Sequence, residues 1–109
     1  TPAIQAWMAR VAAFGNGSVE ESDAAAAIAV AAQSTPASVE KDVFQNDHGI
    51  ALGSRVSITA ESFGLEPTDG ELLAATRTRY TLRRNDPRAG TVHVHFPRVG
   101  FVLKSAAAA

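Results

Sequence analysis

The residues best suited to chemistry in this 109-residue chain are two histidines in its second half. His93 and His95 lie two apart in an alternating stretch, so on a strand both imidazoles would point to the same side. Two histidines can supply two zinc ligands, but zinc sites generally need a third or fourth, and only His48 is left to provide one. We therefore expect no metal site here and two histidines on the solvent face of a strand.

Arginines follow the same stretch and could form an anion-binding face. They are Arg77, Arg79, Arg83, Arg84 and Arg98. Small barrels bind RNA on such faces when exposed aromatic rings stack on the bases. Tyr80 and Phe96 are expected to point inward instead, and the sequence pI of about 6.2 is low for a nucleic-acid module. Nucleic-acid binding is thus an alternative, less favoured than an outer face whose arginines pair with carboxylates.

The charge is divided unevenly along the chain, which has a net charge of −1. Residues 1–69 contain three basic and nine acidic side chains, and residues 70–109 contain seven basic and two acidic ones. Such a division can indicate an anionic partner. We favour the other interpretation, in which the acidic half neutralises the basic half within one molecule.

No arrangement of residues for bond-making is visible. Ser54, Ser57 and Ser62 have no G-x-S-x-G context, and there is neither a Gly-rich phosphate loop nor an H-E-x-x-H motif. The absence of cysteine excludes disulfides and thiolate nucleophiles. We expect no catalytic residue and no cofactor site within this chain, although a longer protein that contains it could be an enzyme.

Five short segments with strand character carry the histidines and arginines. A longer loop follows the first segment, and short turns separate the remaining four from one another. The predicted strands are Arg55–Ala60, Glu71–Arg77, Arg79–Arg84, Thr91–Phe96 and Phe101–Ser105. The inward residues of this domain, 54–105, would include Val56, Ile58, Tyr80, Leu82, Val92, Val94 and Phe96. The order predicts an SH3-like β-barrel, and a partly open five-stranded sheet fits the pattern nearly as well.

Two helices are predicted to precede the strands, over residues 1–33, which gives an α+β fold class. The first begins at Thr1 and Pro2, carries an apolar stripe that includes Trp7 and Val11, and ends at the glycines 15 and 17. Ser18 and Glu21 form a capping box, which predicts a second helix from Ser18 through the alanine run to Gln33. Residues 34–53 then read as a linker and 106–109 as a disordered tail.

Apolar side chains outside the predicted core indicate a surface for interaction. The candidates are Trp7, Val11, Phe63 and Phe101. Because the Trp7 stripe would be exposed in this chain alone, we expect self-association into a homo-oligomer. No apolar run is long enough to cross a membrane, and no secretory signal is visible, so we expect a cytoplasmic location without membrane contact.

Two stretches resemble a known family. The first, PAIQAWMARVAAFG (residues 2–15), resembles the closing helix of the α-domain of glutathione S-transferases, which carries a Trp and a downstream Arg. The second, from Gly53 to Phe101, is similar to an extra C-terminal domain of a bacterial subgroup of glutathione S-transferase-like proteins. Close relatives carry Gly-His-Gly where this chain has Gly-Asn-Gly at 15–17.

This resemblance implies a parent protein with a thioredoxin-like domain, an all-α domain and then the present region. In that family the glutathione contacts and the activating residue lie in the thioredoxin-like domain, and none of those motifs occurs here. The resemblance therefore implies a non-catalytic accessory or interaction domain, whose partners are the parent's N-terminal domains or another protein. Glutathione would be the cofactor of the parent, which would transfer it to electrophiles.

Overall fold

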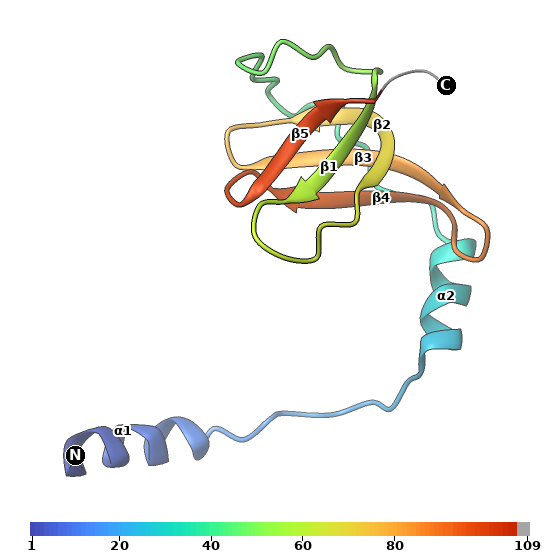
Figure 1. The fold of residues 1–109 in the computed structure, drawn as a ribbon. Coiled ribbons are helices and arrows are strands. Elements are labelled where there is room, and N and C mark those ends of the chain that lie inside the picture. Colours follow the sequence, from blue (N-terminus) through green and yellow to red (C-terminus); the bar gives the residue numbers. More distant parts are fainter. Residues whose placement is uncertain (107–109) are drawn as a thin grey trace.

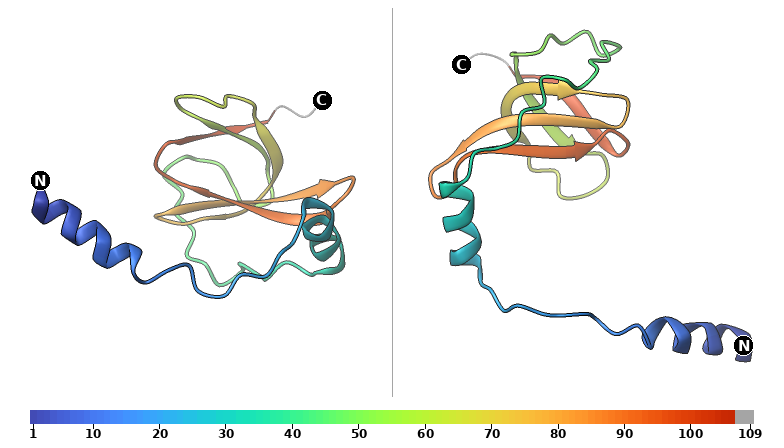
Figure 2. Two further views of the ribbon diagram at one scale, coloured as in Figure 1. Left: turned by 90° about the horizontal axis from the view of Figure 1, so that it is seen from below. Right: turned by 180° about the vertical axis from the view of Figure 1, so that it is seen from behind.

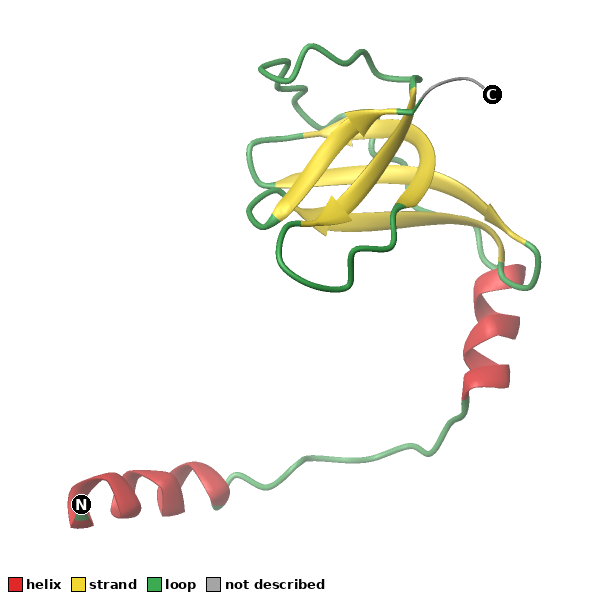
Figure 3. Cartoon of the chain, viewed as in Figure 1, coloured by secondary structure: helices red, strands yellow, loops and turns green. Residues whose placement is uncertain are grey.

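Two helices followed by five antiparallel strands make up the computed structural model, which describes residues 1–106 (Figures 1 and 3). This confirms the predicted order of helices and strands. Residues 107–109, most of the predicted tail, lie outside the described residues. The first residue of that tail, Ala106, donates its backbone N–H to the carbonyl of Arg55 at 2.9 Å, so it continues the sheet.

Helix α1 (Pro2–Ala12) has the predicted start and stands apart from the sheet (Figure 2). The Thr1 hydroxyl accepts from the N–H of Ile4 at 3.4 Å, and Pro2 occupies the first turn, where its missing N–H is not needed. Gly15 and Gly17 both have φ of 68°, a left-handed conformation that glycine adopts without strain. An extended segment then leads to the second helix.

Helix α2 (Ala24–Gln33) begins six residues after the predicted cap at Ser18, so the capping-box prediction is wrong. Asp23 is the N-cap, and its carboxylate accepts from the N–H of Ala26 at 2.8 Å. A helix from Ser18 would have placed Ser22 and Asp23 inside, where both have low helix propensity, whereas Asp23 directly precedes a run of alanines. The start of α2 is therefore determined by Asp23, which caps the alanine run that follows it.

The strands form one antiparallel sheet in the order β4-β3-β2-β1-β5. Their bounds are β1 (Arg55–Ala60), β2 (Thr68–Ala75), β3 (Arg79–Asp86), β4 (Gly90–Pro97) and β5 (Phe101–Ser105). In residues 1–106 no ladder joins β4 to β5, so closure of this sheet into the predicted barrel is not shown. The ladders establish a five-stranded antiparallel sheet.

Strand β2 differs most from its predicted bounds. It starts at Thr68 and stops at Ala75, because the Thr76 hydroxyl accepts from the N–H groups of Thr78 and Arg79, at 3.3 and 3.1 Å, and closes the turn. A register shift between Leu72 and Ala74 settles which of the adjacent leucines points inward: Leu72 is fully buried.

The core lies on the inner side of this bent sheet. Its buried members are Val56, Ile58, Leu72, Ala75, Tyr80 and Leu82. The predicted inward positions of Val56, Ile58, Tyr80 and Leu82 are confirmed, and Phe96 and Phe101 pack against the cluster with ring centroids 5.4 Å apart. Aliphatic side chains supply most of the buried volume, as the low aromatic content requires.

Residues 34–53, the predicted linker, form a strap that crosses the sheet (teal to green in Figure 2, right). The N–H of Gln45 donates to the carbonyl of Ala75 at 2.7 Å, and the N–H of Gly53 donates to that of Leu72 at 2.8 Å. Phe44 and Ile50 pack against the core. The strap is therefore an integral part of the β module, which we define as residues 34–106.

Helix α2 touches the β module at the end of the β3–β4 hairpin, where a Cβ built on Gly90 would lie 3.8 Å from the Cα of Ala32. Within the described residues, neither helix has the length and apolar character needed to cross a membrane.

Candidate functional site

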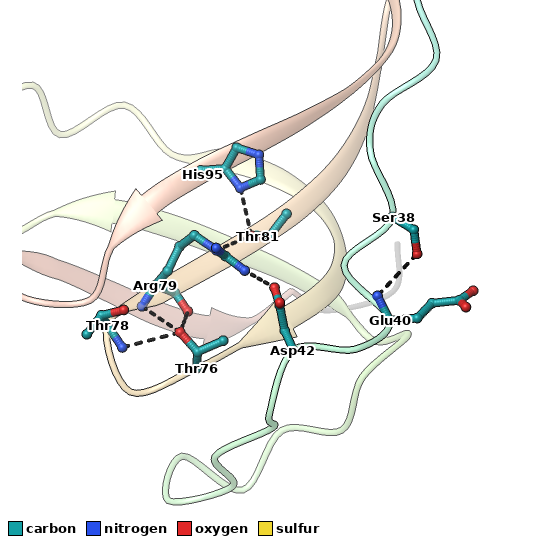
Figure 4. A network of polar contacts seen from close by, with 8 residues as sticks. All are labelled: Ser38, Glu40, Asp42, Thr76, Thr78, Arg79, Thr81 and His95. Carbon is teal, nitrogen blue, oxygen red and sulfur yellow. Dashed lines mark hydrogen bonds and ion pairs between the residues drawn. The ribbon is translucent and has the colours of Figure 1, made fainter.

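The most organised polar region of the molecule is the contact between the strap and strands β3 and β4. Asp42 of the strap forms an ion pair with Arg79 at the start of β3 (Figure 4). The Arg79 Nε group also donates to the hydroxyl of Thr81 at 3.0 Å, and this hydroxyl lies 2.8 Å from Nδ1 of His95. Thr81 is completely buried, so a continuous polar chain runs from the strap across the sheet.

A second arginine fastens the strap near its middle. The guanidinium of Arg98 donates to the carbonyl of Thr76 at 2.7 Å and to the Tyr80 hydroxyl at 3.2 Å, and it forms an ion pair with Asp47. Its Cζ atom lies 5.1 Å from the centroid of the Tyr80 ring. Three residues, Thr76, Tyr80 and Asp47, therefore fix one side chain that is only 15% exposed.

The same contacts shift two pKa values in the directions that keep the pair charged. The hydrogen bond from Arg98 is the main reason that the pKa of Asp47 lies below its usual range. Burial alone would lower the pKa of Arg98, but the hydrogen bonds to Tyr80 and Asp47 outweigh it, and the pKa of Arg98 is raised. Arg98 thus links the strap to the β2–β3 turn, and Asp47 balances its charge.

Three of the five arginines predicted as an anion-binding face form ion pairs within the chain. Arg79 and Arg98 hold strap carboxylates, and Arg83 donates to Glu71 of the neighbouring strand at 3.0 Å. Arg77 lies in the exposed β2–β3 turn, and Arg84 is exposed on β3. The interpretation that the two charged halves neutralise each other agrees with two of these three ion pairs, Arg79–Asp42 and Arg98–Asp47.

The two histidines on β4 have different surroundings. His95 is exposed, as predicted, and contacts Thr81. His93 is half-buried beneath the strap, so its expected solvent-facing position is wrong; Nδ1 is buried and lacks a hydrogen-bond partner in the described residues. Burial, and then the positive charges of Arg83 and His95, lower the pKa of His93, although a hydrogen bond to the backbone of Ala37 opposes this. Burial of His93 therefore favours the neutral form of its ring.

Two adjacent cavities, of about 280 and 390 Å³, flank His93. Both are lined by Pro36, Val39, Thr91 and His93; the first extends toward the end of α2 and the second toward Leu73 and Arg83. Apolar side chains form much of the lining. Among residues 1–106, no three His, Asp or Glu side chains come together as metal ligands.

The predicted interaction residues lie in three separate places. Trp7 and Val11 are 57% and 47% exposed on α1, and Phe63 is exposed in the β1–β2 loop. Phe101 instead packs on Phe96 at the edge of the core. The exposed stripe of α1 is the largest of these surfaces, since Ile4, Met8 and Phe14 extend it.

Sequence reasoning missed the strap and its two aspartates. The only sequence signal for them was the acidic character of the first half, which pointed to internal pairing but not to which residues pair. His48 also lies inside the strap–sheet contact, between Phe44 and Tyr80, with ring centroids 5.6 and 6.2 Å from its own.

Comparison with known proteins relates the chain to a protein of known structure. No family model and no curated protein matches the chain. The chain is similar to a GST-like protein from Pseudomonas syringae of known crystal structure, with 40% sequence identity and a TM-score of 0.87. The match covers 95% of this chain and 38% of that protein, so the chain spans well under half the length of its relative.

Proposed function

We propose that this chain, which matches part of a bacterial GST-like protein, is the non-catalytic C-terminal accessory region of such a protein. In this proposal α1 is the last helix of the parent's α-domain, and the β module is an interaction domain attached through the extended residues 13–23. The parent would transfer glutathione to electrophiles through domains that precede this region.

The exposed apolar stripe on α1 is the single observation that supports the attachment most directly. Large apolar side chains recur along one side of α1, and those of Ile4, Trp7, Met8 and Val11 are all exposed. An isolated helix of eleven residues is marginal in water, so a surface of this kind needs a partner. The 62% of the similar protein that this chain does not span is large enough to contain one.

The polar chemistry of the β module supports an accessory role. Three of its arginines are engaged within the module: Arg79 and Arg98 pair with aspartates of the strap, and Arg83 pairs with Glu71 of the neighbouring strand. The strand order and the short connection between β4 and β5, which brings Phe96 against Phe101, support an SH3-like arrangement of the strands as a further part of this proposal. Domains of this size often hold a protein partner at their loops.

Deletion within the parent protein tests the proposed role. Removal of residues 24–109 should leave the rate of glutathione transfer to 1-chloro-2,4-dinitrobenzene within about twofold, because the proposed catalytic groups lie elsewhere. Trp7→Ala in the full-length parent should instead lower its melting temperature, with Gln5→Ala on another side of α1 as the matched control. A loss of transfer activity beyond tenfold in a deletion variant that remains folded would contradict the proposal.

A further inference from the structure

Asn16 and Gly17 lie in the extended segment between α1 and α2, away from the sheet (Figures 1 and 2). Every residue from 13 to 23 is exposed. Gly17 has φ of 68°, and apart from its chain neighbours no atom lies within 4 Å of the place where a Cβ would be built on it. Both residues are therefore open to water, and no other element packs on Gly17.

The two groups that could react with each other here are not committed elsewhere. In the described part of the chain, the N–H of Gly17 donates to no acceptor and the side-chain amide of Asn16 makes no hydrogen bond. An asparagine side chain has the length at which the backbone nitrogen of the next residue can close a five-membered ring on it. Glycine is the next residue that obstructs this approach least, because it has no Cβ and rotates freely.

From this arrangement we propose that Asn16 is a site of spontaneous covalent modification. The backbone nitrogen of Gly17 loses its proton to water or hydroxide and attacks Cγ of Asn16. A bond forms between this nitrogen and Cγ, the bond from Cγ to Nδ2 breaks, and Nδ2 leaves as ammonia. The product is a succinimide ring that contains the Gly17 nitrogen.

Water then opens the succinimide at either of its two carbonyl carbons. Attack at Cγ restores the ordinary main chain and leaves aspartate at position 16. Attack at the backbone carbonyl carbon leaves isoaspartate, in which the main chain runs through Cγ. In both cases one water is consumed and one ammonia is released, so the reaction needs no oxidant, reductant or other partner.

The structure disfavours the same reaction at the other two asparagines of the chain. Asn85 lies in β3, and its Oδ1 accepts from the hydroxyl of Thr91 at 2.8 Å. Asn46 lies in the strap, and the next residue, Asp47, is held by its ion pair with Arg98. Both asparagines precede an aspartate, whose side chain obstructs the backbone nitrogen. Selectivity for Asn16 thus follows from its neighbour and from its position outside the β module.

Asp69 and Gly70 form an internal control for the effect of the fold. An aspartate before a glycine can close the same ring, with water as the leaving group in place of ammonia. Gly70, however, pairs with Val56 in the β1–β2 ladder, and a Cβ built on it would lie 2.5 Å from the carbonyl oxygen of Arg83. The backbone rotation that ring closure requires would break this ladder, so we expect no reaction there in the folded chain.

Modification would change the charge and the length of the segment. The side chain at position 16 changes from neutral to negative, beside the three acids Glu20, Glu21 and Asp23. The isoaspartate product also adds a carbon atom to the main chain. In the proposed function this segment joins α1 to the β module, so the consequence for a parent protein rests on that proposal, whereas the reaction itself does not.

Peptide mapping by mass spectrometry tests the proposal on the whole 109-residue chain, kept for increasing times at about 37 °C and about pH 8.5. Position 16 should show the mass change for exchange of ammonia with water at least about tenfold faster than positions 46 and 85. Enzymatic carboxyl methylation should detect isoaspartate in the same peptide. Equal rates at the three asparagines, or an unmodified position 16, would overturn the proposal.

Two glycine substitutions with matched backbone geometry test the attacking group. Gly17→Ala should slow the reaction at least about tenfold, because its methyl group obstructs the nitrogen. Gly15→Ala should keep the original rate, since Gly15 has the same φ of 68° and the same open surroundings but lies on the other side of Asn16. Equal rates in the two variants would overturn the proposal.

Unfolding in guanidinium chloride separates the effect of the structure from that of the local sequence. The rate at Asn16 should stay within about threefold, because the segment is already open in the folded chain. Isomerisation at Asp69 should become detectable once the β1–β2 ladder is lost. A larger increase at Asn16 on unfolding would contradict the proposal, since it would show that the folded chain protects this position.

These measurements also keep the reaction distinct from the proposed accessory role. Modification of Asn16 is measured on the chain alone, whereas the accessory role is measured as transfer activity of the parent protein. Failure of one therefore leaves the other standing.

Discussion

Arg98 lies over the ring of Tyr80 and donates to its hydroxyl group, so one guanidinium satisfies a buried phenol from two directions. The same group donates to the carbonyl of Thr76 and pairs with Asp47. A turn residue of β4–β5 therefore joins the β2–β3 turn, the core and the strap at one point.

We predict that Arg98→Lys destabilises the β module by about 2 kcal/mol, because a lysine ammonium cannot reproduce the planar fork that reaches three acceptors. Urea unfolding monitored by Tyr80 and backbone signals measures the change in free energy. Arg77→Lys, in the exposed turn nearby, should change it by less than about 0.5 kcal/mol. Equal effects of the two substitutions would show that the contacts of Arg98 add nothing specific.

We predict that the Asp47–Arg98 pair stabilises the fold at neutral pH and ceases to do so in acid. Because the folded-state pKa of Asp47 lies below the ordinary aspartate value of 3.8, its contribution is fully present above that value. The contribution disappears as the pH falls through the lower, folded-state pKa. Asp47→Asn should therefore be less stable than the unaltered protein at pH 6, and the difference should shrink toward acid pH in a series of urea titrations. A difference that stays constant down to pH 3 would contradict this.

The sequence predicted the strands better than their surroundings, for a physical reason. Alternation along β1, and at Tyr80 and Leu82 of β3, reports which side chains face the core, because successive side chains of a strand point to opposite faces. On β4 the prediction holds for Phe96, which packs against the core, whereas Val92 and Val94 are only half-buried and lie outside the core cluster. Leu72 and Leu73 broke that alternation, and the register shift at this point explains why. Whether β4 and β5 would pair could not be read from either strand, since closure depends on how far the whole sheet bends.

The packing of the strap on the sheet could not be predicted from alternation, because the residues that make its contacts do not recur at a regular spacing. Phe44 and Ile50 are six apart in irregular backbone, and the aspartates 42 and 47 pair with arginines more than thirty residues away. Only the opposite charges of the two halves of the chain indicated that such pairs exist. The same lack of period concealed His48, whose Nδ1 accepts from the backbone N–H of Ile50.

We predict that Asp23→Ala reduces the helicity of α2, whereas Ser18→Ala does not. Loss of an N-cap side chain costs about 1 kcal/mol, and α2 has little packing to compensate, since its residues are largely exposed. Far-UV circular dichroism and the Cα chemical shifts of residues 24–33 measure the helix content of both variants. A loss of helicity in Ser18→Ala equal to that in Asp23→Ala would restore the capping box as the start of the helix.

We predict that the 109-residue chain by itself associates through α1. Trp7 is 57% exposed and lies on the same side of the helix as Ile4, Met8 and Val11, so burial of this stripe against a second copy is favoured by the hydrophobic effect. Analytical ultracentrifugation between about 10 and 500 µM should show a rising average mass, with blue-shifted Trp7 fluorescence at the higher concentrations. Trp7→Ala with Val11→Ala should sediment as a monomer throughout, while Gln5→Ala, outside the stripe, should associate as before. A monomeric unaltered chain at the highest concentration would contradict this prediction and would leave the parent's preceding domain as the partner of the stripe.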